Sequence, residues 1–559
     1  MGKEIELKLR VSPEDITVLR NHPHFVDTFH DPVHETLNST YFDSDDRFLR
    51  EHGLTLRVRQ IGPERVQTIK SIDQGSDWLE RSEWEQTIQG DQPDLAPATD
   101  AGLGPILTDE VRKALKPIFQ TRIERTTYSR NGDGTNIILA MDEGQIVAND
   151  SLCPVSEIEL ELKQGTTAEL FKIARAINEI VPAQLDVKSK SERGYDLIEN
   201  RLLTVEKAYN PTISAGISAD HAFTIIGRAC LRHLVANIAA TINRDVEALH
   251  QMRVALRRLR ASISLFSDFL GDNKIAAIKT ELKWLAREFG PARNLDTHIF
   301  EVLRPLRKRH PKAPGLVSVG KMFARQRLKC YRRVQEAVQS DRFRTLVLDT
   351  AEWLEAGPWT RSGSPLEQAR REAPIEIYAA EQLSRRFRKI KRRGAKIAYL
   401  SPGELHRLRI QAKKARYAAE FFSSAYAGKK SAKRRKKILS SLTQLQNSLG
   451  RINDIATHKS LFTDIIDNPR PRLTAKQNQQ RAFAAGLIIG DQQAQIPGLL
   501  ESARKAYARF NRAKPFWRLS HRRNSSSQLQ LPLTGSEVTQ AGKEDLGAAF
   551  KAPLQFQPE

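Results

Sequence analysis

The sequence predicts two consecutive domains: an antiparallel α+β domain whose sheet closes or nearly closes into a barrel, and then an all-α domain of two related helical bundles. Three observations lead to this prediction. Segments with every-second alternation of charged and apolar residues fill the first 200 residues, helical patterns fill most of the remainder, and one helical motif occurs twice. A chain of 559 residues is also too long for one ordinary hydrophobic core.

The strands are predicted from their alternation. The chain opens with EIELKLR, in which Glu4, Glu6 and Lys8 share one face and the intervening aliphatic residues share the other. The same pattern returns in TLRVRQI, VQTIKSI, SEWEQTI, NIILAMDEG and SEIELELK, with turn signals such as NGDG between several of them. EDITVLRNH and TAELFKIARAINEI are typical of helices. Many strands with charged and apolar faces favour a barrel.

The pattern changes after about residue 203, so the first domain is assigned to 1–203. Pro211 and Gly216 indicate a linker at 204–217, and the helical domain is expected at 218–512. From 513 to 559 the chain is mostly polar, which predicts a disordered tail.

A helical motif begins at His250 and again at His406. Basic residues follow each histidine at +3, +7, +8 and +10, beside an apolar seam that ends at Phe266 in the first copy and at Phe422 in the second. The related segments GPARNLDTH and LGRINDIATH follow at similar distances. Two related bundles in tandem are therefore expected.

The two parts of the chain differ strongly in charge. Residues 1–200 contain 23 Lys and Arg against 36 Asp and Glu, a net charge of −13, whereas the remainder carries +36. The basic part indicates an anionic partner. Three cysteines without motif spacing argue against a disulfide framework, and no apolar segment approaches the roughly 20 residues of a membrane span. We therefore expect a cytoplasmic protein with no membrane partner.

The charged faces of the strands allow two interpretations. On the outside of the sheet they form an ordinary solvated surface. Inside a barrel, crowded carboxylates repel each other unless cations or metal ions share the cavity. Glu83 and Glu85 in SEWEQ, Arg57 and Arg59 in LRVR, and Lys70 in TIK would add to such an interior. An acidic wall opposite a basic wall suits a complex of metal and polyphosphate.

As an ordered set, these segments resemble the CYTH domains of the triphosphate tunnel metalloenzymes. EIELK matches the ExExK signature of that family, and YFD, LRVR, TIK, RSEWE, TRIER, MDEG, EIELELK and KSKSERGY follow it over about residues 1–200. The resemblance implies an eight-stranded tunnel that binds a triphosphate end-on and hydrolyses it with Mg²⁺ or Mn²⁺. Inorganic triphosphate is the expected substrate, and diphosphate and phosphate are the expected products.

The resemblance also implies roles for individual residues. The residues expected to bind the substrate phosphates are Lys8, Arg57, Arg59, Lys70, Arg122, Arg125, Lys188 and Lys190. Those expected to hold the divalent metal are Glu4, Glu6, Asp142, Glu157, Glu159 and Glu161. The residues with expected catalytic roles are Glu4, Glu6, Lys8 and Glu159. A water positioned by a carboxylate would attack the terminal phosphorus in line, and which carboxylate does so stays open.

The helical part resembles the CHAD domains, which commonly follow a CYTH domain and are associated with inorganic polyphosphate. The residues expected to bind it are His250, Arg253, Arg257, Arg260, His406, Arg409, Lys413 and Arg416. At +3, +7 and +10 the basic residues project to one side of each helix. A pair of solvated basic faces is the alternative interpretation, and metal binding by the two histidines is disfavoured because cations surround them.

Other functions stay open. The same tunnel family includes thiamine triphosphatases, class IV adenylate cyclases and RNA triphosphatases, but no added aromatic motif here selects a base or a thiazolium. A non-catalytic polyphosphate-binding scaffold would not need six metal-type carboxylates. Nucleic acid is not the expected partner, because no basic surface with interleaved aromatic residues for base stacking is evident.

Overall fold

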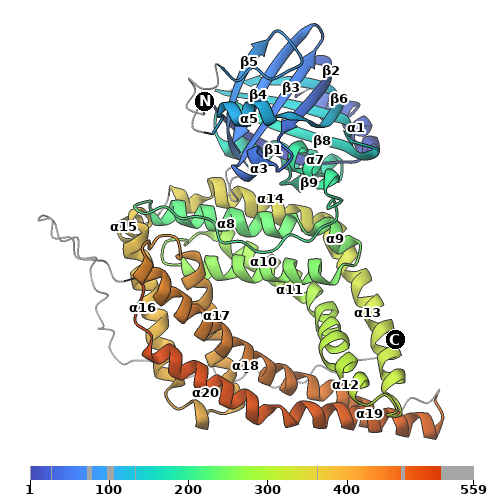
Figure 1. The fold of residues 1–559 in the computed structure, drawn as a ribbon, viewed down its shortest axis with the longest axis vertical. Coiled ribbons are helices and arrows are strands. Elements are labelled where there is room, and N and C mark those ends of the chain that lie inside the picture. The colour runs from blue at the N-terminus through green and yellow to red at the C-terminus, as the bar shows by residue number, and fades with distance from the viewer. Residues whose placement is uncertain are drawn as a thin grey trace, which may run out of the picture. The chain divides into compact units, whose positions relative to one another are not determined.

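The first part of the chain forms an antiparallel barrel in the computed structural model, which describes residues 2–517 except 27, 72–78, 97–105, 133, 362 and 468–472. The sheet order is β5-β4-β3-β2-β6-β7-β8-β1-β9, and an additional pairing of β1 with β5 closes it (Figure 1). The strands are β1 (Gly2–Arg10), β2 (His30–Asp43), β3 (Leu54–Ile61), β4 (Glu64–Ser71), β5 (Glu80–Ile88), β6 (Lys116–Gly132), β7 (Thr135–Ala148), β8 (Ser151–Gln164) and β9 (Gln184–Asp186). The predicted eight-stranded barrel is confirmed, and the short β9, which pairs with β1, is an addition.

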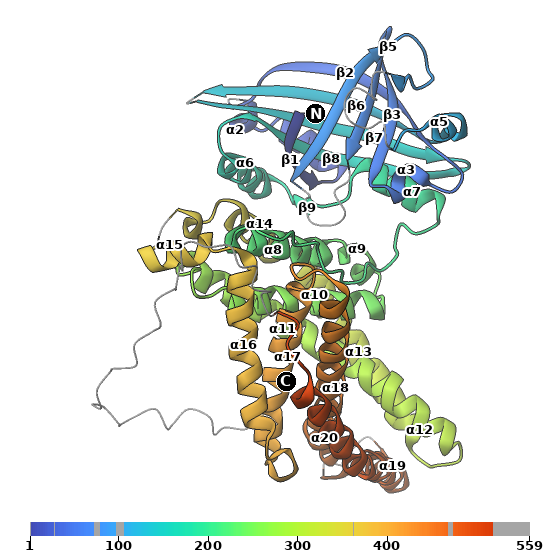
Figure 2. The same cartoon turned by 60° about the vertical axis from the view of Figure 1, so that its left-hand side comes forward.

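The barrel carries its charged side chains inside and its aliphatic side chains outside. On β1 the alternating charged residues line an interior cavity, while Leu7 and Leu9 are fully buried on the opposite face. The outer aliphatic residues are buried because helices α1 (Pro13–Arg20; Figure 1) and α6 (Thr167–Ile180; Figure 2) pack in the same hydrophobic cluster. The charged faces of the strands therefore form an interior and not a solvated outer surface.

A second part of the barrel interior is apolar, and helix α7 (Lys190–Ile198) fills it. Tyr195 and Leu197 of α7 pack with residues of β2, β6, β7 and β8, among them Phe119 and Ile123. The first turn of α7 instead contributes to the charged cavity. One short helix thus supplies both the apolar filling and part of the polar lining.

The second part of the chain is helical throughout. Its helices are α8 (Ala219–Val235), α9 (Ile238–Ile242), α10 (Val246–Leu265), α11 (Asn273–Thr297), α12 (Arg304–Arg309), α13 (Leu316–Gln339), α14 (Asp341–Ala356), α15 (Pro365–Glu372), α16 (Ile375–Gly394), α17 (Pro402–Phe421), α18 (Lys429–Asp467), α19 (Ala475–Ala494) and α20 (Ile496–Arg512). The segment Ala219–Ile242 is long and apolar enough to cross a membrane by length and composition, but 67% of its apolar window is buried in the protein, as in the core helix of a globular domain.

The two copies of the repeated motif form α10 and α17, which pack against each other. Each is followed along the chain by a long helix, α11 or α18. Phe266 and Phe422, the last residues of the two apolar seams, meet with ring centroids 5.7 Å apart. The seams therefore lie at the centre of the helical domain and bring the two copies together.

The first residues of the predicted tail pack against the helical domain. Phe516 and Trp517 are buried, and the indole of Trp517 lies 4.5 Å from the ring of Phe387 and donates a hydrogen bond to Ser384. Burial of two large aromatic side chains explains why the chain stays folded past α20. The rest of the predicted tail, 518–559, lies outside the described residues.

Replacing Gly194 by Ala should destabilise the barrel domain. A Cβ atom at this position would lie 2.2 Å from Cε2 of the Phe119 ring, so either α7 or β6 must shift. We expect a loss of about 1–3 kcal/mol in the free energy of unfolding, as for other overpacked cores. Chemical denaturation would measure this loss, and Gly490→Ala, where a Cβ meets no atom within 4 Å, is the control.

Candidate active site and basic cluster

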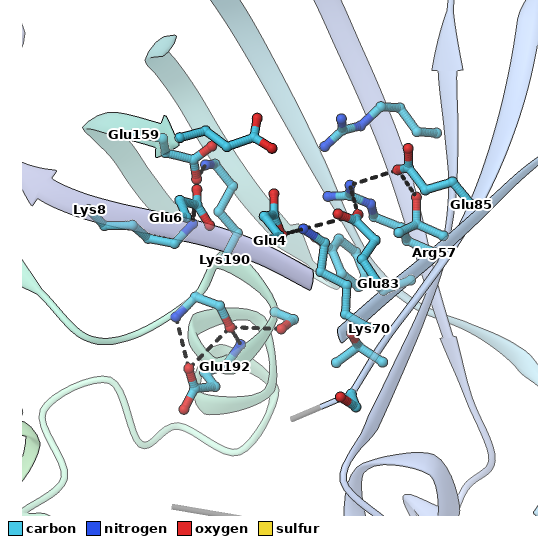
Figure 3. A pocket seen from close by; sticks show the side chains of 18 of the residues that line it. Glu4, Glu6, Lys8, Arg57, Lys70, Glu83, Glu85, Glu159, Lys190 and Glu192 are labelled. Carbon is cyan, nitrogen blue, oxygen red and sulfur yellow. Dashed lines mark hydrogen bonds and ion pairs between the residues drawn. The ribbon is translucent and has the colours of Figure 1, made fainter. Parts of the chain in front are cut away.

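A polar cavity of about 230 Å³ lies inside the barrel (Figure 3). Strands β1, β2, β3, β4, β5, β6 and β8 and the first turn of α7 contribute to it. The lining residues are Glu4, Glu6, Lys8, Tyr41, Thr55, Arg57, Arg59, Thr68, Lys70, Ser71, Glu83, Glu85, Arg125, Glu159, Glu161, Lys163, Ser189, Lys190, Ser191 and Glu192. Because they come from rigid paired strands, their charged groups are held in place before any ligand binds.

One side of the cavity is built around Glu6, Lys8 and Glu159. Lys8 Nζ lies 2.9 Å from an oxygen of Glu6 and 2.5 Å from an oxygen of Glu159. Burial and the neighbouring carboxylate of Glu159 raise the pKa of Glu6. Burial acts in the same direction on Glu159, but Lys190, Lys8 and Arg125 outweigh it and hold the pKa of Glu159 well below its usual range. Glu6 is therefore the carboxylate whose charge is least compensated by these cations.

A buried acidic cluster lies behind this side. Oxygen atoms of Asp142, Glu157 and Glu159 lie within 4.8 Å of one another. Lys190 Nζ lies 2.6 Å from Asp142 and 2.9 Å from Glu159, and it also contacts Glu157. Arg125 binds both oxygens of Asp142, at 2.7 and 2.6 Å. Asp142 and Glu157 are fully buried and do not line the cavity.

The carboxylates fit a hard divalent cation to different degrees. Carboxylate oxygens are the ligands that Mg²⁺ prefers. All six predicted metal ligands have cationic neighbours, but Asp142 and Glu157 lie outside the cavity, whereas Glu4, Glu6, Glu159 and Glu161 face it. The raised pKa of Glu6 indicates negative charge that a cation in the cavity would stabilise. The residues that face the cavity are therefore the better candidates for metal ligands.

The other side of the cavity is basic. Lys70 Nζ lies 2.6 Å from Glu4 and 3.0 Å from Glu83, which ties this side to the acidic one. Arg57 is 3.8 Å from Glu83, a long ion pair. Arg59 donates a hydrogen bond of 3.2 Å to Ser39, and no carboxylate oxygen of the described residues is found within 4.0 Å of its guanidinium nitrogens.

Arg59 is consequently an underpaired cation in a polar cavity. Burial, together with the positive charges of Arg57 and Arg125, lowers its pKa to about 10. Burial opposes ionisation of Tyr41 as well, but Arg57 and Arg59 outweigh it and lower the pKa of that phenol. An anion bound beside Arg59 would remove this electrostatic strain.

The structure brings most of the predicted tunnel residues together. Those that line the cavity are Glu4, Glu6, Lys8, Arg57, Arg59, Lys70, Arg125, Glu159, Glu161 and Lys190. Two predicted phosphate ligands lie elsewhere. Arg122 is exposed on the outer face of β6, because it is three residues from Arg125 and a strand alternates sides at every residue. Lys188 pairs with Asp196 at 2.8 Å and with Glu206 at 3.2 Å.

Sequence reasoning left several site residues out. Glu83 and Glu85 are predicted to add to a charged interior but are not among the predicted ligands, and both line the cavity. Arg193 lies in the matched segment KSKSERGY and pairs with the buried carboxylate of Glu157. Tyr41 lies in the matched YFD segment. The matched segments KSKSERGY and YFD contain Arg193 and Tyr41, but only the fold shows in which direction their side chains point.

The helical domain holds a second group of charged residues, which we call the basic cluster: Arg257 and Arg260 of α10, and Arg409 and Lys413 of α17. Burial lowers the pKa of Lys413 to about 8, and the positive charges of Arg409, Arg257 and Arg260 add to the effect. Cations from both copies of the repeat are therefore close enough to repel one another.

Each copy of the repeat also places a glycine beside an arginine of the motif. A Cβ at Gly290 of α11 would lie 3.5 Å from Nη1 of Arg253, and a Cβ at Gly450 of α18 would lie 3.4 Å from Nε of Arg409. Burial lowers the pKa of Arg253 to about 10, with Arg257 and Arg293 contributing. The segments GPARN and LGRIN thus contact the His-x-x-Arg motif in equivalent ways.

The two histidines differ in their surroundings. Burial and the charge of Arg293 lower the pKa of His250 to about 4, so His250 is neutral at physiological pH. His406 is exposed, and its Nδ1 lies 2.5 Å from the side-chain oxygen of Asn453 in α18. Arg416 binds Gln446 at 2.9 Å and pairs with Glu420, whereas among the described residues no carboxylate oxygen is found within 4.0 Å of the cationic groups of the basic cluster.

Comparison with known proteins gives two successive matches. Residues 2–195 match the family model of the CYTH domain, and residues 225–463 match that of the CHAD domain. An inorganic triphosphatase from Haemophilus influenzae is 34% identical over 214 residues, which cover 36% of this chain and 57% of that protein. The match therefore spans little more than half the length of this relative.

Solved structures resemble each part separately. The CHAD domain from the plant Ricinus communis is 27% identical, with 54% of this chain and 96% of that chain covered and a TM-score of 0.45. An inorganic triphosphatase is 20% identical, with 35% of this chain and 96% of that chain covered and a TM-score of 0.16. These scores are too low to carry an argument. The two family models match separate and successive parts of the chain, so this chain contains a CYTH domain followed by a CHAD domain.

Proposed function

We propose that the protein is a cytoplasmic, metal-dependent hydrolase that converts inorganic triphosphate to diphosphate and phosphate. The observation that carries this proposal is the charge distribution of one cavity, with Glu6 and Glu159 on one side and Arg57 and Arg59 on the other. In a triphosphate bound to a divalent cation, the phosphate oxygens match the basic side of the cavity and the metal ion matches the acidic side. The name of the Haemophilus influenzae relative supports the same substrate.

In the proposed mechanism, the basic side binds and orients the phosphate chain. Arg59, which lacks a carboxylate partner among the described residues, takes a phosphate oxygen, and Arg57 and Lys70 neutralise the remaining charge. Lys8 and Lys190 hold the Glu159 carboxylate between them, which keeps it ionised, and both line the cavity as proposed ligands of the phosphate oxygens. Fixed strands allow these groups to stabilise charge in the transition state without reorganising.

The acidic side holds the metal and positions the attacking water. Glu4, Glu6, Glu159 and Glu161 are the proposed ligands of Mg²⁺ or Mn²⁺, which supplies neutralisation of phosphate oxygens when bound. One of these carboxylates orients a water in line with the terminal phosphorus and accepts its proton. Asp142 and Glu157, which are fully buried, act behind this side by fixing Arg125 and Lys190.

We further propose that the helical domain, at 218–512, binds inorganic polyphosphate through the basic cluster. The supporting observation is that burial, together with repulsion from Arg409, Arg257 and Arg260, lowers the pKa of Lys413 to about 8. A polyanion removes that repulsion and gains from the release of its counterions. The tunnel domain at 1–203 and the linker at 204–217 complete the proposed organisation.

Removal of a cavity carboxylate should reduce turnover without unfolding the protein. We expect Glu4→Gln and Glu159→Gln to lower kcat for tripolyphosphate by about 10- to 100-fold, because each removes a ligand charge and no apolar contact. Phosphate release would be measured with and without Mg²⁺, alongside thiamine triphosphate, ATP and long-chain polyphosphate. Glu110→Gln, an exposed carboxylate on α5 (Asp109–Ala114), is the control. Full activity in chelator would contradict the proposal.

Arg59→Ala should weaken substrate binding. Loss of a charged hydrogen bond to phosphate should cost about 1.5–3 kcal/mol of binding free energy. Calorimetric titration of tripolyphosphate into the metal-free Glu159→Gln background would separate binding from turnover. Arg65→Ala removes the same charge from β4, where Arg65 pairs with the exposed Asp91, and should leave the affinity unchanged. Equal affinities for the two variants would exclude Arg59 as a phosphate ligand.

The triple substitution Arg257→Ala, Arg409→Ala and Lys413→Ala should weaken polyphosphate binding. Binding to the full-length protein should fall steeply with salt in the wild type and less steeply in the variant, because fewer counterions are exchanged. Arg504→Ala, Lys505→Ala and Arg509→Ala on α20 form a control of equal charge. Tripolyphosphate hydrolysis should survive in both variants. Equal affinity for duplex DNA and polyphosphate at physiological salt would favour a general nucleic-acid role instead.

A further inference from the structure

An arginine of the helical domain reaches the tunnel domain at the point where α7 begins. Arg232 lies on α8, and its Nη1 donates a hydrogen bond of 2.6 Å to the backbone carbonyl of Val187. Its Nη2 binds the carboxylate of Glu192 in the first turn of α7. One guanidinium therefore ties the chain before α7 to the helix itself.

Glu192 is also the residue that caps α7. Its second carboxylate oxygen accepts hydrogen bonds from the backbone nitrogen of Ser189, at 2.9 Å, and from the Ser189 hydroxyl, at 3.1 Å. The Ser189 hydroxyl in turn accepts a hydrogen bond from the backbone nitrogen of Glu192 at 3.1 Å. This reciprocal capping box fixes where α7 starts. Because Arg232 occupies the other oxygen of Glu192, it holds the carboxylate in the capping orientation.

The turn held in this way lines the tunnel. Ser189, Lys190, Ser191 and Glu192 all face the cavity, and Lys190 contacts the carboxylates of the buried acidic cluster. A shift of the first turn of α7 would move the Lys190 ammonium away from Glu159. Placement of this lysine therefore depends on the Glu192 cap.

The linker makes a second tie at the same place. The carboxylate of Glu206 lies 3.2 Å from Lys188 Nζ, next to the capping residue. The side-chain amide of Asn237 makes two hydrogen bonds to the backbone of Glu206. Its oxygen accepts from the Glu206 nitrogen at 3.1 Å, and its nitrogen donates to the Glu206 carbonyl at 3.0 Å. The chain before α7 is thus anchored twice to residues of the helical part.

We propose that Arg232 is a positioning residue of the tunnel: through Val187 and Glu192 it fixes the first turn of α7, and with it Lys190, for binding of the triphosphate. This inference rests on the proposed function of the tunnel. The helical domain then completes the substrate site and is not only an attached binding module. The tunnel domain without α8 would bind its substrate more weakly.

The chain offers a matched control on the same helix. Arg228 lies one turn before Arg232 on α8, and it binds Glu355 of α14 through Nε at 2.7 Å and Nη2 at 2.5 Å. Both arginines are largely buried and paired with a carboxylate. Arg228→Gln therefore removes an equivalent ion pair within the helical domain and leaves α7 untouched.

The test compares Arg232→Gln, Arg232→Lys and Arg228→Gln in the full-length protein. For tripolyphosphate hydrolysis we expect Arg232→Gln to raise KM about tenfold with little change in kcat, as for loss of one charged hydrogen bond. Arg232→Lys keeps the charge but loses the bidentate hydrogen bonding of the guanidinium, so its KM should lie between those of Arg232→Gln and wild type. Arg228→Gln should keep the wild-type KM, although it can lower the thermal midpoint.

Hydrogen exchange of the amides at 188–193 gives a readout that does not depend on activity. We expect faster exchange in Arg232→Gln than in wild type or Arg228→Gln. Unchanged KM and unchanged exchange in Arg232→Gln would overturn the inference while leaving the proposed function intact. Equal rises of KM in Arg232→Gln and Arg228→Gln would also overturn it, because the effect would then be general destabilisation. A wild-type protein that does not hydrolyse tripolyphosphate would refute the proposed function, and the exchange comparison would still decide whether Arg232 holds α7.

Discussion

Charge balance inside the barrel is the constraint on which the tunnel domain depends. Isolated charges are costly to bury, so a barrel that turns its carboxylates inward must bring cations to them. Asp142, Glu157 and Glu159 meet this requirement through Lys190, Arg125 and Arg193. Breaking one such pair leaves its partner as an unpaired buried charge. The interior therefore has little freedom to rearrange, and the paired cations form a rigid base for the less paired groups that face the cavity.

The inward charges also explain the rest of the domain. A sheet with a polar interior must bury its aliphatic face on the outside, and helices α1 and α6 supply the covering. Helix α7 then fills the apolar part of the interior through Tyr195 and Leu197, while its first turn brings Lys190 to the carboxylates. The position of this one helix is set by both requirements, which is why contacts at its first turn bear directly on the site.

The alternation in the sequence predicted six of the barrel strands, whereas β2 and β6 lie outside the alternating segments, and the eight-stranded barrel came from the family resemblance carried by the ordered motifs. At TRIER the prediction included both Arg122 and Arg125 as ligands, although residues three apart lie on opposite faces of a strand. Ile123 shares the inner face with Arg125 because the interior is partly apolar, so the simple rule of charged residues inside and aliphatic residues outside fails there. Arg232 could not be predicted from the sequence for another reason. Its partners Val187 and Glu192 are distant in sequence and meet it only once α7 is docked.

Helical geometry separates the basic residues of the repeat in a similar way. Residues at +3, +7 and +10 lie on one side of a helix, whereas +8 lies well away from them. Arg258, at +8 in the first copy, is buried, donates to the carbonyl of Tyr209 at 2.9 Å, and so holds the linker. Lys414, its equivalent in the second copy, is exposed, and among the described residues no carboxylate is found within 4.0 Å of its ammonium. The two copies thus share a positive charge at +8, and the contact with the linker gives Arg258 a structural role.

The two domains treat cations in opposite ways, and this difference follows from what each surface has to do. In the tunnel most cations have a carboxylate within hydrogen-bonding distance, and Arg59 stands out as an underpaired group beside the cavity. In the basic cluster the positive charges of Arg409, Arg257 and Arg260 act on the buried Lys413, and among the described residues no carboxylate oxygen is found within 4.0 Å of its ammonium. A paired interior keeps its geometry whether or not a ligand is present, which suits chemistry on one short substrate. Several cations that lie close together on packed helices can all contact one long anion. Binding of a long polyanion then gains free energy from the release of its counterions.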